Sequence, residues 1–514
     1  MPMRFKRVRS HWPIAVILIF ATGIRLWGVD FGLPYAYHVD EPRYIHSAVG
    51  IIQSGNLNPG WFYQPSLYTY LVTILIGGYY LFGRLIGKFQ TVDDLFRPPY
   101  HFDGFIDLPN EFLIARLLTI IFGVATIWLV YYTARRWMGN IGAIVAALFL
   151  AVSIFHVSSS RFIATDVPVA FFVVLTLYAA GQIAEGGGLR DYLLAGIALG
   201  LAIGTKYSAY VLVLPIILAH LLAWRRGTTK LLSTSLLWLT LSTGFTAFIT
   251  TPFALFDSSS FIRDIIYEWR HHKILGHIGA EGDSAQWLSL ELISRSDRWL
   301  TITAIFGFGL GLYRKNRKIL LVFSFTIAYF ISMATNSVRF ERFLVPLIPA
   351  LALAAGYFLG ELYEQYSGMN RQLIITAVVV LIFIEPVISV MKSGQILSNP
   401  DTRTIARNWI KENIPTGSRI ARETYAPNLD GMGYDVNTFS RLNEHPVSWY
   451  VENGFDYLVF AQARYGNLYD EPDRYAEQIA GYNALFERLT LVSELRGSYV
   501  DRPDHVIRIY SSPP

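Results

Sequence analysis

The sequence contains no cysteine, and charged residues are scarce. The absence of cysteine excludes disulfide bonds, thiolate metal sites and cysteine nucleophiles, so a domain outside the cell must be stabilised by its packing alone. Charged residues make up 16% of the chain, against about 25% in soluble domains, whereas apolar residues reach 53%. Because the apolar residues form blocks of roughly twenty, the length that crosses a bilayer, the composition indicates an all-α polytopic membrane protein.

Two further features are missing. The basic residues lie in short loop clusters rather than along one face, which excludes a nucleic-acid partner. No internal repeat is found, although many transporters are built from repeated halves.

Eleven apolar segments are predicted to cross the membrane. Their approximate ranges are 12–28, 111–134, 140–157, 167–184, 190–205, 207–224, 231–252, 298–313, 319–335, 343–363 and 372–392.

The N-terminal residues set the orientation of the first span. Arg4, Lys6, Arg7 and Arg9 precede it, and we interpret it as uncleaved, with a cytoplasmic N-terminus. A signal peptide is the alternative.

A twelfth apolar segment, 66–86, needs a separate decision. If it crossed the membrane, three basic clusters would face outward, whereas leaving it out places all three inside, as membrane proteins prefer. The clusters are Arg135/Arg136, Arg225/Arg226/Lys230 and Arg314/Lys315/Arg317/Lys318. We therefore expect 66–86 to be a juxtamembrane helix in the outer interface, within a first outside loop at 29–110.

The tail differs in composition from the rest of the chain. We predict a membrane domain at 1–392 and a small extracytoplasmic α/β domain at 393–514, with a helix at 401–413 and strands at 457–460 and 505–510. The lack of cysteine and the modest length suit the plasma (inner) membrane of a bacterial or archaeal envelope.

Ionisable side chains gather at the outer boundary, where each costs about 2.5–3.5 kcal/mol and is a candidate functional residue. The segment Tyr37-His38-Val39-Asp40-Glu41-Pro42-Arg43-Tyr44 follows the first span, and Asp166 begins the fourth. Paired carboxylates beside an arginine and tyrosines suit the binding of a sugar and the removal of a proton. The structural alternative is that Asp40 and Asp166 cap helix N-termini.

Cations lie at the same boundary. Arg116 is inside the second span, Lys206 lies between two spans, and Arg339 and Arg342 precede the tenth. Such cations suit a lipid phosphate, because arginine offers two-pronged contacts. The alternative is that they are anchors whose side chains extend to the interface.

The third outside loop, 253–297, contains candidate metal ligands. These are His271, His272, His277 and Glu281. Their spacing suits a divalent cation, and a polar loop helix is the alternative interpretation.

Taken in order, these motifs resemble the GT-C glycosyltransferases of the protein O-mannosyltransferase and lipid A aminoarabinose transferase group, glycosyltransferase family 39. The segments that carry the resemblance are Asp40-Glu41-Pro42-Arg43-Tyr44, Tyr63-Gln64-Pro65-Ser66-Leu67, Ala115-Arg116-Leu117, Ala134-Arg135-Arg136, Ser160 to Asp166, and Arg339 to Ala350. Their order and spacing extend through the whole membrane part.

The resemblance implies a GT-C fold and an activity. The donor would be a sugar on a polyprenyl phosphate, transferred with inversion to a lipid, glycan or protein acceptor outside the membrane. Asp40 would be the general base, and Glu41 and Asp166 would orient the acceptor or Asp40. The donor phosphate would contact Arg43, Arg116, Lys206, Arg339 and Arg342, and the substrate cavity would include Tyr37, His38, Tyr44, Tyr63, Gln64 and Arg161. No cofactor is required, and a divalent metal stays an open alternative.

The chain also departs from this group. Members resembling the aminoarabinose transferase have a Glu-Lys pair where this chain has Tyr63-Gln64, so one phosphate contact is missing. The loop at 253–297 is too short for the inserted carbohydrate-binding domain of eukaryotic mannosyltransferases. Competing hypotheses are a transporter or flippase of a lipid-linked envelope precursor, and a structural or sensory membrane protein.

Overall fold

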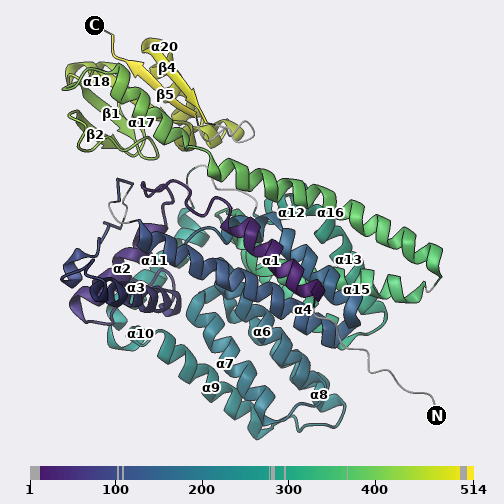
Figure 1. The fold of residues 1–514 in the computed structure, drawn as a ribbon. Helices are drawn as coiled ribbons and strands as arrows, with labels where there is room; N and C mark the ends of the chain where they lie inside the picture. The colour runs from purple at the N-terminus through teal and green to yellow at the C-terminus, as the bar shows by residue number, and fades with distance from the viewer. Residues whose placement is uncertain are drawn as a thin grey trace.

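The chain folds into a body of long helices joined to a small mixed domain at its C-terminal end (Figure 1). The computed structural model describes residues 12–100, 103–106, 109–276, 278, 284–294, 297–366, 368–497 and 506–513. The helices of the body are α1 (Trp12–Leu26), α2 (Glu41–Ser54), α3 (Leu67–Leu85), α4 (Asn110–Val152), α5 (Ile154–Ser159), α6 (Asp166–Ala184), α7 (Leu189–Thr205), α8 (Val213–Arg225), α9 (Thr234–Thr250), α10 (Phe253–Phe256), α11 (Ser258–Arg270), α12 (Ser284–Ser294), α13 (Arg298–Tyr313), α14 (Arg317–Ala334), α15 (Ile348–Gln365) and α16 (Met369–Ser398).

Short helical turns connect several of these elements. They are η1 (Val92–Asp94), η2 (Tyr207–Leu212), η3 (His271–Leu275) and η4 (Glu341–Leu347). The C-terminal domain contains α17 (Thr402–Asn413), β1 (Arg419–Glu423), β2 (Asp435–Phe439), η5 (Leu442–Glu444), α18 (Val447–Glu452), β3 (Tyr457–Ala461), α19 (Gln462–Tyr465), η6 (Gly466–Asp470), α20 (Ala476–Arg488), β4 (Thr490–Arg496) and β5 (Val506–Ser511).

Helices cover most of each of the eleven predicted ranges. By length and composition alone, six helical stretches of the described chain are suited to cross a membrane, and further apolar helices such as α1 and α9 are shorter. The 43 residues of α4 contain a break at Met138 and Gly139, where φ is 82° at the glycine. The predicted spans 111–134 and 140–157 lie on the two sides of this break. The protein is a multi-pass membrane protein, and the number of helices that cross stays a prediction.

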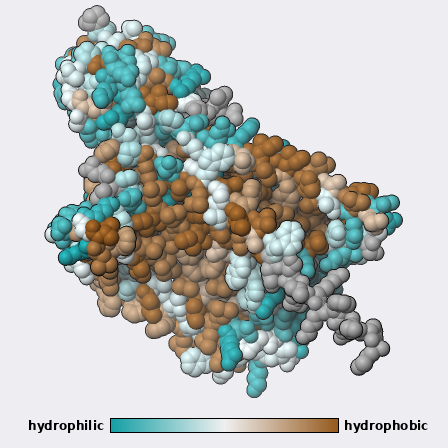
Figure 2. Space-filling model, in the orientation of Figure 1, coloured by the Kyte–Doolittle hydropathy of each residue, from teal (hydrophilic) through white to brown (hydrophobic). Residues whose placement is uncertain are grey.

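The surface agrees with this assignment. Figure 2 shows apolar residues spread over the helical body, with hydrophilic residues on the C-terminal domain and on the loops at the opposite end. On α16 the side chains of Leu373, Ile374 and Leu381 are each more than 60% exposed. Such a helix is stable only in an apolar solvent, because in water its exposed apolar surface would be unfavourable.

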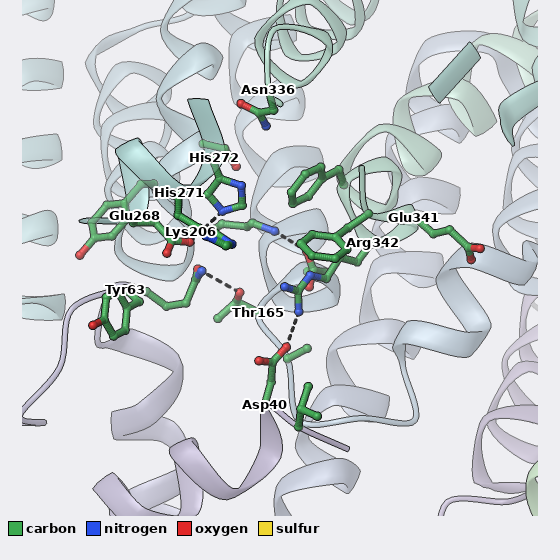
Figure 3. Close-up of a pocket in the computed structure, with 18 of the residues that line it drawn as sticks. Asp40, Tyr63, Thr165, Lys206, Glu268, His271, His272, Asn336, Glu341 and Arg342 are labelled. Carbon is green, nitrogen blue, oxygen red and sulfur yellow. Dashed lines mark hydrogen bonds and ion pairs between the residues drawn. The ribbon is translucent and has the colours of Figure 1, made fainter. Parts of the chain in front are cut away.

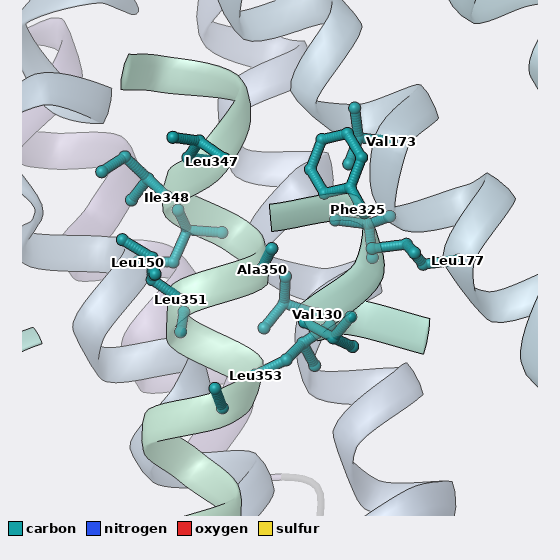
Figure 4. Packing of buried hydrophobic residues seen from close by; sticks show 14 of the residues in the cluster. Val130, Leu150, Val173, Leu177, Phe325, Leu347, Ile348, Ala350, Leu351 and Leu353 are labelled. Carbon is teal, nitrogen blue, oxygen red and sulfur yellow. The ribbon is translucent and has the colours of Figure 1, made fainter. Parts of the chain in front are cut away.

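The core of the body is built around α15. Leu347, Ile348 and Leu351 pack with Leu150 of α4, and Phe325 of α14 completes the neighbouring layer (Figure 4). Glycines let the two central helices approach more closely than side chains would allow. A Cβ added at Gly356 of α15 would lie 2.4 Å from the carbonyl oxygen of Gly142 of α4.

A second close contact joins α7 to α9. Gly196, Gly200 and Gly204 recur every fourth residue on α7, and Ser242, Thr246 and Thr250 recur at the same spacing on α9. Added Cβ atoms would lie 2.0–2.6 Å from these three side chains. Small residues at this spacing are typical of helix pairs inside membranes, where close packing replaces the hydrophobic effect as the source of association.

The loop at 29–110, predicted to lie outside, contains α2 and α3, which lie side by side at one end of the body (Figure 1). The sequence predicts a helix at 66–86, and α3 is that helix. Its placement in the membrane interface stays a prediction.

The C-terminal domain is a five-stranded sheet in the order β2-β1-β3-β5-β4. β1 pairs in parallel with β2 and β3, and β5 is antiparallel to β3 and β4. The predicted helix at 401–413 and strands at 457–460 and 505–510 correspond to α17, β3 and β5. Because β1, β2 and β3 are parallel, their carboxyl ends lie at one edge of the sheet.

Polar contacts connect this domain to the body. Arg422 of β1 donates a hydrogen bond of 2.9 Å to the Asp103 carboxylate in the first outer loop. Arg339, before η4, forms an ion pair with Glu471. These contacts hold the carboxyl edge of the sheet beside the outer loops.

Candidate active site

A cavity of about 1970 Å³ lies where the loops at one end of the helical body meet the C-terminal domain. Its wall comes from the segment before α2, the start of α6, η2, α11, η3, the end of α14, η4 and the loops after β1, β2 and β3. The cavity is therefore continuous from the apolar helices to the outer domain. Figure 3 shows charged side chains from several of these segments pointing toward one another.

Asp40 occupies the position before the first residue of α2, where the sequence also permits a capping role. Its carboxylate makes no capping hydrogen bond. It forms an ion pair with Arg342 of η4 and keeps 27% of its side-chain surface exposed (Figure 3). Asp40 therefore faces the cavity.

Several charges act on Asp40. Burial disfavours its ionised form, but neighbouring positive charge, chiefly that of Arg342, outweighs this effect and holds the pKa of the carboxyl well below its usual range. Asp40 is therefore an ionised carboxylate at neutral pH.

Glu41 and Arg116 form a buried ion pair behind this site. Two hydrogen bonds of 2.8 Å and 2.6 Å join the guanidinium to the carboxylate, and both side chains are fully buried. Arg116 also donates to the carbonyl oxygens of Val29 and Phe31, and Glu41 accepts a hydrogen bond from the Ile163 backbone at 3.0 Å. Neither side chain lines the cavity. Because Glu41 directly follows Asp40, the pair holds the backbone at Asp40 in place.

Asp166 is the first residue of α6 and makes an ion pair with Lys206, which lies between α7 and η2. Both side chains line the cavity and are mostly buried. The Lys206 ammonium also lies 5.7 Å from the centroid of the Phe343 ring. Asp40 and Asp166, predicted to share one site, thus face the same cavity.

Arg43 is held by aromatic rings. Its guanidinium carbon lies 5.7 Å from the centroids of both Trp61 and Tyr63. Within the described part of the chain it has no ion pair with a carboxylate. Gln64, next to Tyr63, accepts a hydrogen bond of 3.5 Å from Thr165. Arg43, Tyr63 and Gln64 all line the cavity, and Arg43 is a cation available to an anionic ligand.

The three remaining residues predicted near Asp40 also line the cavity: Tyr37, His38 and Tyr44. The Tyr37 hydroxyl is 2.7 Å from that of Thr404 in α17, and Arg403 lies 3.9 Å from its ring centroid. Burial lowers the pKa of His38, which therefore favours its neutral form at neutral pH.

Besides Arg116, two predicted arginines are placed outside the cavity wall. Arg161 is fully buried and donates hydrogen bonds to the Ser393 hydroxyl at 2.8 Å and to the Ile24 carbonyl oxygen at 2.7 Å. Arg339 is paired with Glu471 of the C-terminal domain. Both contacts connect segments distant in sequence rather than supplying a face to the cavity.

The predicted metal ligands are only partly within the described chain. His271 and His272 line the cavity, and His272 Nε2 lies 2.9 Å from the Glu268 carboxylate. His277 and Glu281 lie outside the described residues. Among the described residues, no group of three side chains is arranged to hold a metal ion.

Other residues of the wall were not predicted. They include Tyr207, Tyr210, Tyr267, Glu268, Arg403, Thr424, Tyr425, Ser440 and Arg464. Tyr207 directly follows Lys206, which is a usable sequence signal. The residues after β1 and β2 had no sequence signal that pointed to a site, because neither strand was predicted.

Comparisons with known proteins agree on the fold. Residues 100–253 match the family model described as dolichyl-phosphate-mannose-protein mannosyltransferase. No curated protein sequence matches the chain. Among solved structures, ArnT from Cupriavidus metallidurans bound to undecaprenyl phosphate is similar, with 15% identity, a TM-score of 0.52, and coverage of 98% of this chain and 99% of that one.

Two archaeal structures are also similar. The oligosaccharyltransferase of Archaeoglobus fulgidus in the apo form has 12% identity and a TM-score of 0.54, covering 99% of this chain and 77% of that one. AglB from the same organism, in complex with an inhibitory peptide and a dolichol-phosphate, has 13% identity and a TM-score of 0.52, covering 98% and 76%. The predicted resemblance is confirmed: the chain has the GT-C membrane fold of the ArnT-like and protein O-mannosyltransferase group.

Proposed function

We propose that this protein is a membrane glycosyltransferase, which moves a sugar from a polyprenyl-phosphate donor to an acceptor hydroxyl outside the membrane, with inversion at the anomeric carbon. The observation that carries the proposal is the single cavity lined by Asp40, Asp166, Arg43, Lys206 and Arg342. This cavity combines one ionised base with cations for a phosphate, which are the two groups that such a transfer needs.

Asp40 is the general base. The acceptor oxygen forms a bond to the anomeric carbon while the bond from that carbon to the phosphate oxygen breaks. Asp40 accepts the hydroxyl proton, and the polyprenyl phosphate leaves with the bonding electrons. A phosphate is stable as an anion, so the protein stabilises it with cations and need not protonate it.

Arg43 is the first phosphate ligand, because its guanidinium has no carboxylate partner in the described chain and the Trp61 and Tyr63 rings hold it in place. Lys206 and Arg342 flank the same space, each balanced by an acid. This chain has Tyr63-Gln64 where members resembling the aminoarabinose transferase have a Glu-Lys pair, and Lys206 supplies an ammonium group in place of that missing lysine. Arg116 and Arg339, engaged elsewhere, are not part of this phosphate site.

The lipid tail of the donor lies along the apolar end of the cavity. Val213 and Leu214 of α8 and Ile331 of α14 line this end, and they are 40–57% exposed at the surface of the helical body. A polyprenyl chain between α8 and α14 would keep its tail in contact with lipid while its phosphate reaches Lys206. The similar ArnT structure is bound to undecaprenyl phosphate, which supports a lipid phosphate as ligand.

The transporter hypothesis places charged side chains on broken helices near mid-membrane. Here the charged side chains lie at helix ends beside the outer loops, next to the C-terminal domain. This arrangement favours chemistry at the outer boundary over passage through the membrane.

The test replaces Asp40 with Asn in the native host. A deletion strain is complemented with the wild type, with Asp40→Asn or with Asp30→Asn, and its envelope glycans and glycolipids are compared by mass spectrometry. We expect Asp40→Asn to match the deletion strain, because loss of a positioned base lowers a rate on the order of 10²–10⁴-fold.

Asp30→Asn is the matched control, since Asp30 is exposed on the same outer loop and does not line the cavity. It should restore the wild-type pattern. A wild-type pattern in the Asp40→Asn strain, at equal protein level, would disprove the assignment of the base.

A further inference from the structure

The outer end of the cavity is formed by the C-terminal domain. Thr424, Tyr425, Ser440 and Arg464 all line the cavity, and they lie just after the carboxyl ends of β1, β2 and β3. Loops at the carboxyl ends of parallel strands commonly form ligand-binding crevices. Tyr37 lines the same cavity, so a single extended ligand has space to reach from these residues to the segment before α2.

The chemistry of this end differs from that of the phosphate site. Arg464 donates hydrogen bonds to the Ser440 carbonyl oxygen at 2.9 Å and to its hydroxyl at 2.8 Å. Its guanidinium carbon lies 5.3 Å from the centroid of the Tyr425 ring. An aromatic face beside a guanidinium and two hydroxyl groups is suited to a pyranose ring, whose C–H face packs on the aromatic ring and whose hydroxyls accept and donate hydrogen bonds.

The backbone of Tyr425 adds an independent observation. Its φ is 70°, a left-handed conformation that favours glycine and is rare for an aromatic residue. Such outliers cluster at ligand-binding sites, where a strained residue is retained for what its side chain contacts. Tyr425 is half-buried and lines the cavity.

A peptide acceptor is less suited to this surface. Extended peptides are commonly bound by strand addition at an open sheet edge, and the open edges of this sheet belong to β2 and β4, whose residues do not line the cavity. The cavity volume of about 1970 Å³ also exceeds the roughly 300–1,000 Å³ of a pocket for one small molecule. It has space for a donor headgroup together with an acceptor of several units.

We propose that Tyr425, Arg464 and Ser440 form a saccharide subsite, and that the acceptor is a glycan chain whose distal ring stacks on Tyr425 while its terminal hydroxyl reaches Asp40. This proposal rests on the proposed glycosyl transfer, because it identifies the class of acceptor for that reaction.

The experiment uses the full-length protein in detergent, fluorescently labelled and applied to an array of immobilised oligosaccharides and an array of immobilised peptides. The wild type is expected to bind a subset of the oligosaccharides and none of the peptides. Tyr425→Gly and Arg464→Gln are each expected to weaken that binding at least tenfold.

Two controls separate binding from folding. Tyr425→Gly removes the ring but relieves the left-handed backbone, so thermal unfolding should show no large loss of stability. Arg488→Gln removes an exposed arginine at the end of α20, which does not line the cavity, and should bind glycans as the wild type does.

The outcomes distinguish this proposal from the proposed function. Three results would overturn the saccharide subsite, even where Asp40→Asn abolishes transfer. The wild type could bind only peptides, it could bind neither array, or Tyr425→Gly and Arg464→Gln could bind glycans as well as the wild type does. If Asp40→Asn keeps transfer while Tyr425→Gly loses glycan binding, the subsite stands and the assignment of the base falls.

Discussion

Arg342 sets the protonation of Asp40. Burial alone would raise the pKa of this carboxyl, and Arg342 provides the largest of the opposing attractions. In Arg342→Gln the burial remains and the cation is lost, so the pKa of Asp40 rises. Because the base works only when ionised, the acid limb of the kcat/KM profile should move to higher pH. Measuring transfer across the acid range checks this, and an unmoved acid limb would contradict the role of Arg342.

Glu41 and Arg116 illustrate a different use of charge. Arg116→Met leaves the Glu41 carboxylate buried without its partner, which we expect to destabilise the protein by about 3–5 kcal/mol. Thermal unfolding in detergent measures the loss. Arg314→Met, which breaks an exposed ion pair with Glu361, is the control and should change the melting temperature little. Equal shifts in the two variants would argue against a structural role for the buried pair.

These residues also show the limits of the sequence. Position at the predicted membrane boundary identified Asp40, Asp166, Arg43, Lys206 and Arg342, which all line one cavity. The sequence could not show which charges neutralise one another. Arg116 was expected to bind phosphate, yet its partner Glu41 lies 75 positions away, and such pairing depends on how α2 packs against α4.

At the scale of elements, β1 ends in a buried acid. Glu423 accepts hydrogen bonds from the Leu442 and Ala461 backbones and from the Tyr482 hydroxyl. Burial, which disfavours the charged form, outweighs these contacts and raises the pKa of Glu423 to about 7. The folded domain therefore favours the protonated acid more strongly than the unfolded chain does.

The stability of this domain should therefore fall as pH rises. The contribution of Glu423 is fully present below its ordinary pKa and is lost as pH rises through about 7, a change of about 3 kcal/mol. Unfolding followed by the fluorescence of Trp409 and Trp449 between about pH 4 and about pH 8 measures it. Glu423→Gln stays neutral and should flatten the dependence, and a variant as pH-sensitive as the wild type would contradict this origin.

The elements themselves were unequally predictable. Long apolar helices such as α6 and α15 are evident because their length and composition admit few alternatives in a membrane. β3 and β5 have buried apolar runs and were predicted. β2 and β4 expose most of their residues and lack clean alternation, so only pairing with their neighbours defines them.

At the scale of the whole molecule, orientation is the main prediction. Because the chain has no cysteine, Arg226→Cys and Glu477→Cys each introduce a single, exposed thiol. In intact cells made permeable only at the outer envelope, a membrane-impermeant maleimide should label the cysteine at 477 and not that at 226. Labelling of both after lysis is the control, and the reverse pattern in intact cells would invert the proposed topology.

The glycine contact between α4 and α15 has a consequence for how substrates enter. With one backbone resting directly on the other, sliding either helix would force a carbonyl oxygen into its neighbour. The two helices therefore behave as a stationary frame, and η4 carries Arg342 on that frame. The C-terminal domain is joined to the body by polar side-chain contacts, among them Arg422 with Asp103 and Arg339 with Glu471. If the protein transfers sugar as proposed, substrates are thus expected to enter without displacement of α4 against α15, and Arg342 keeps its position during loading.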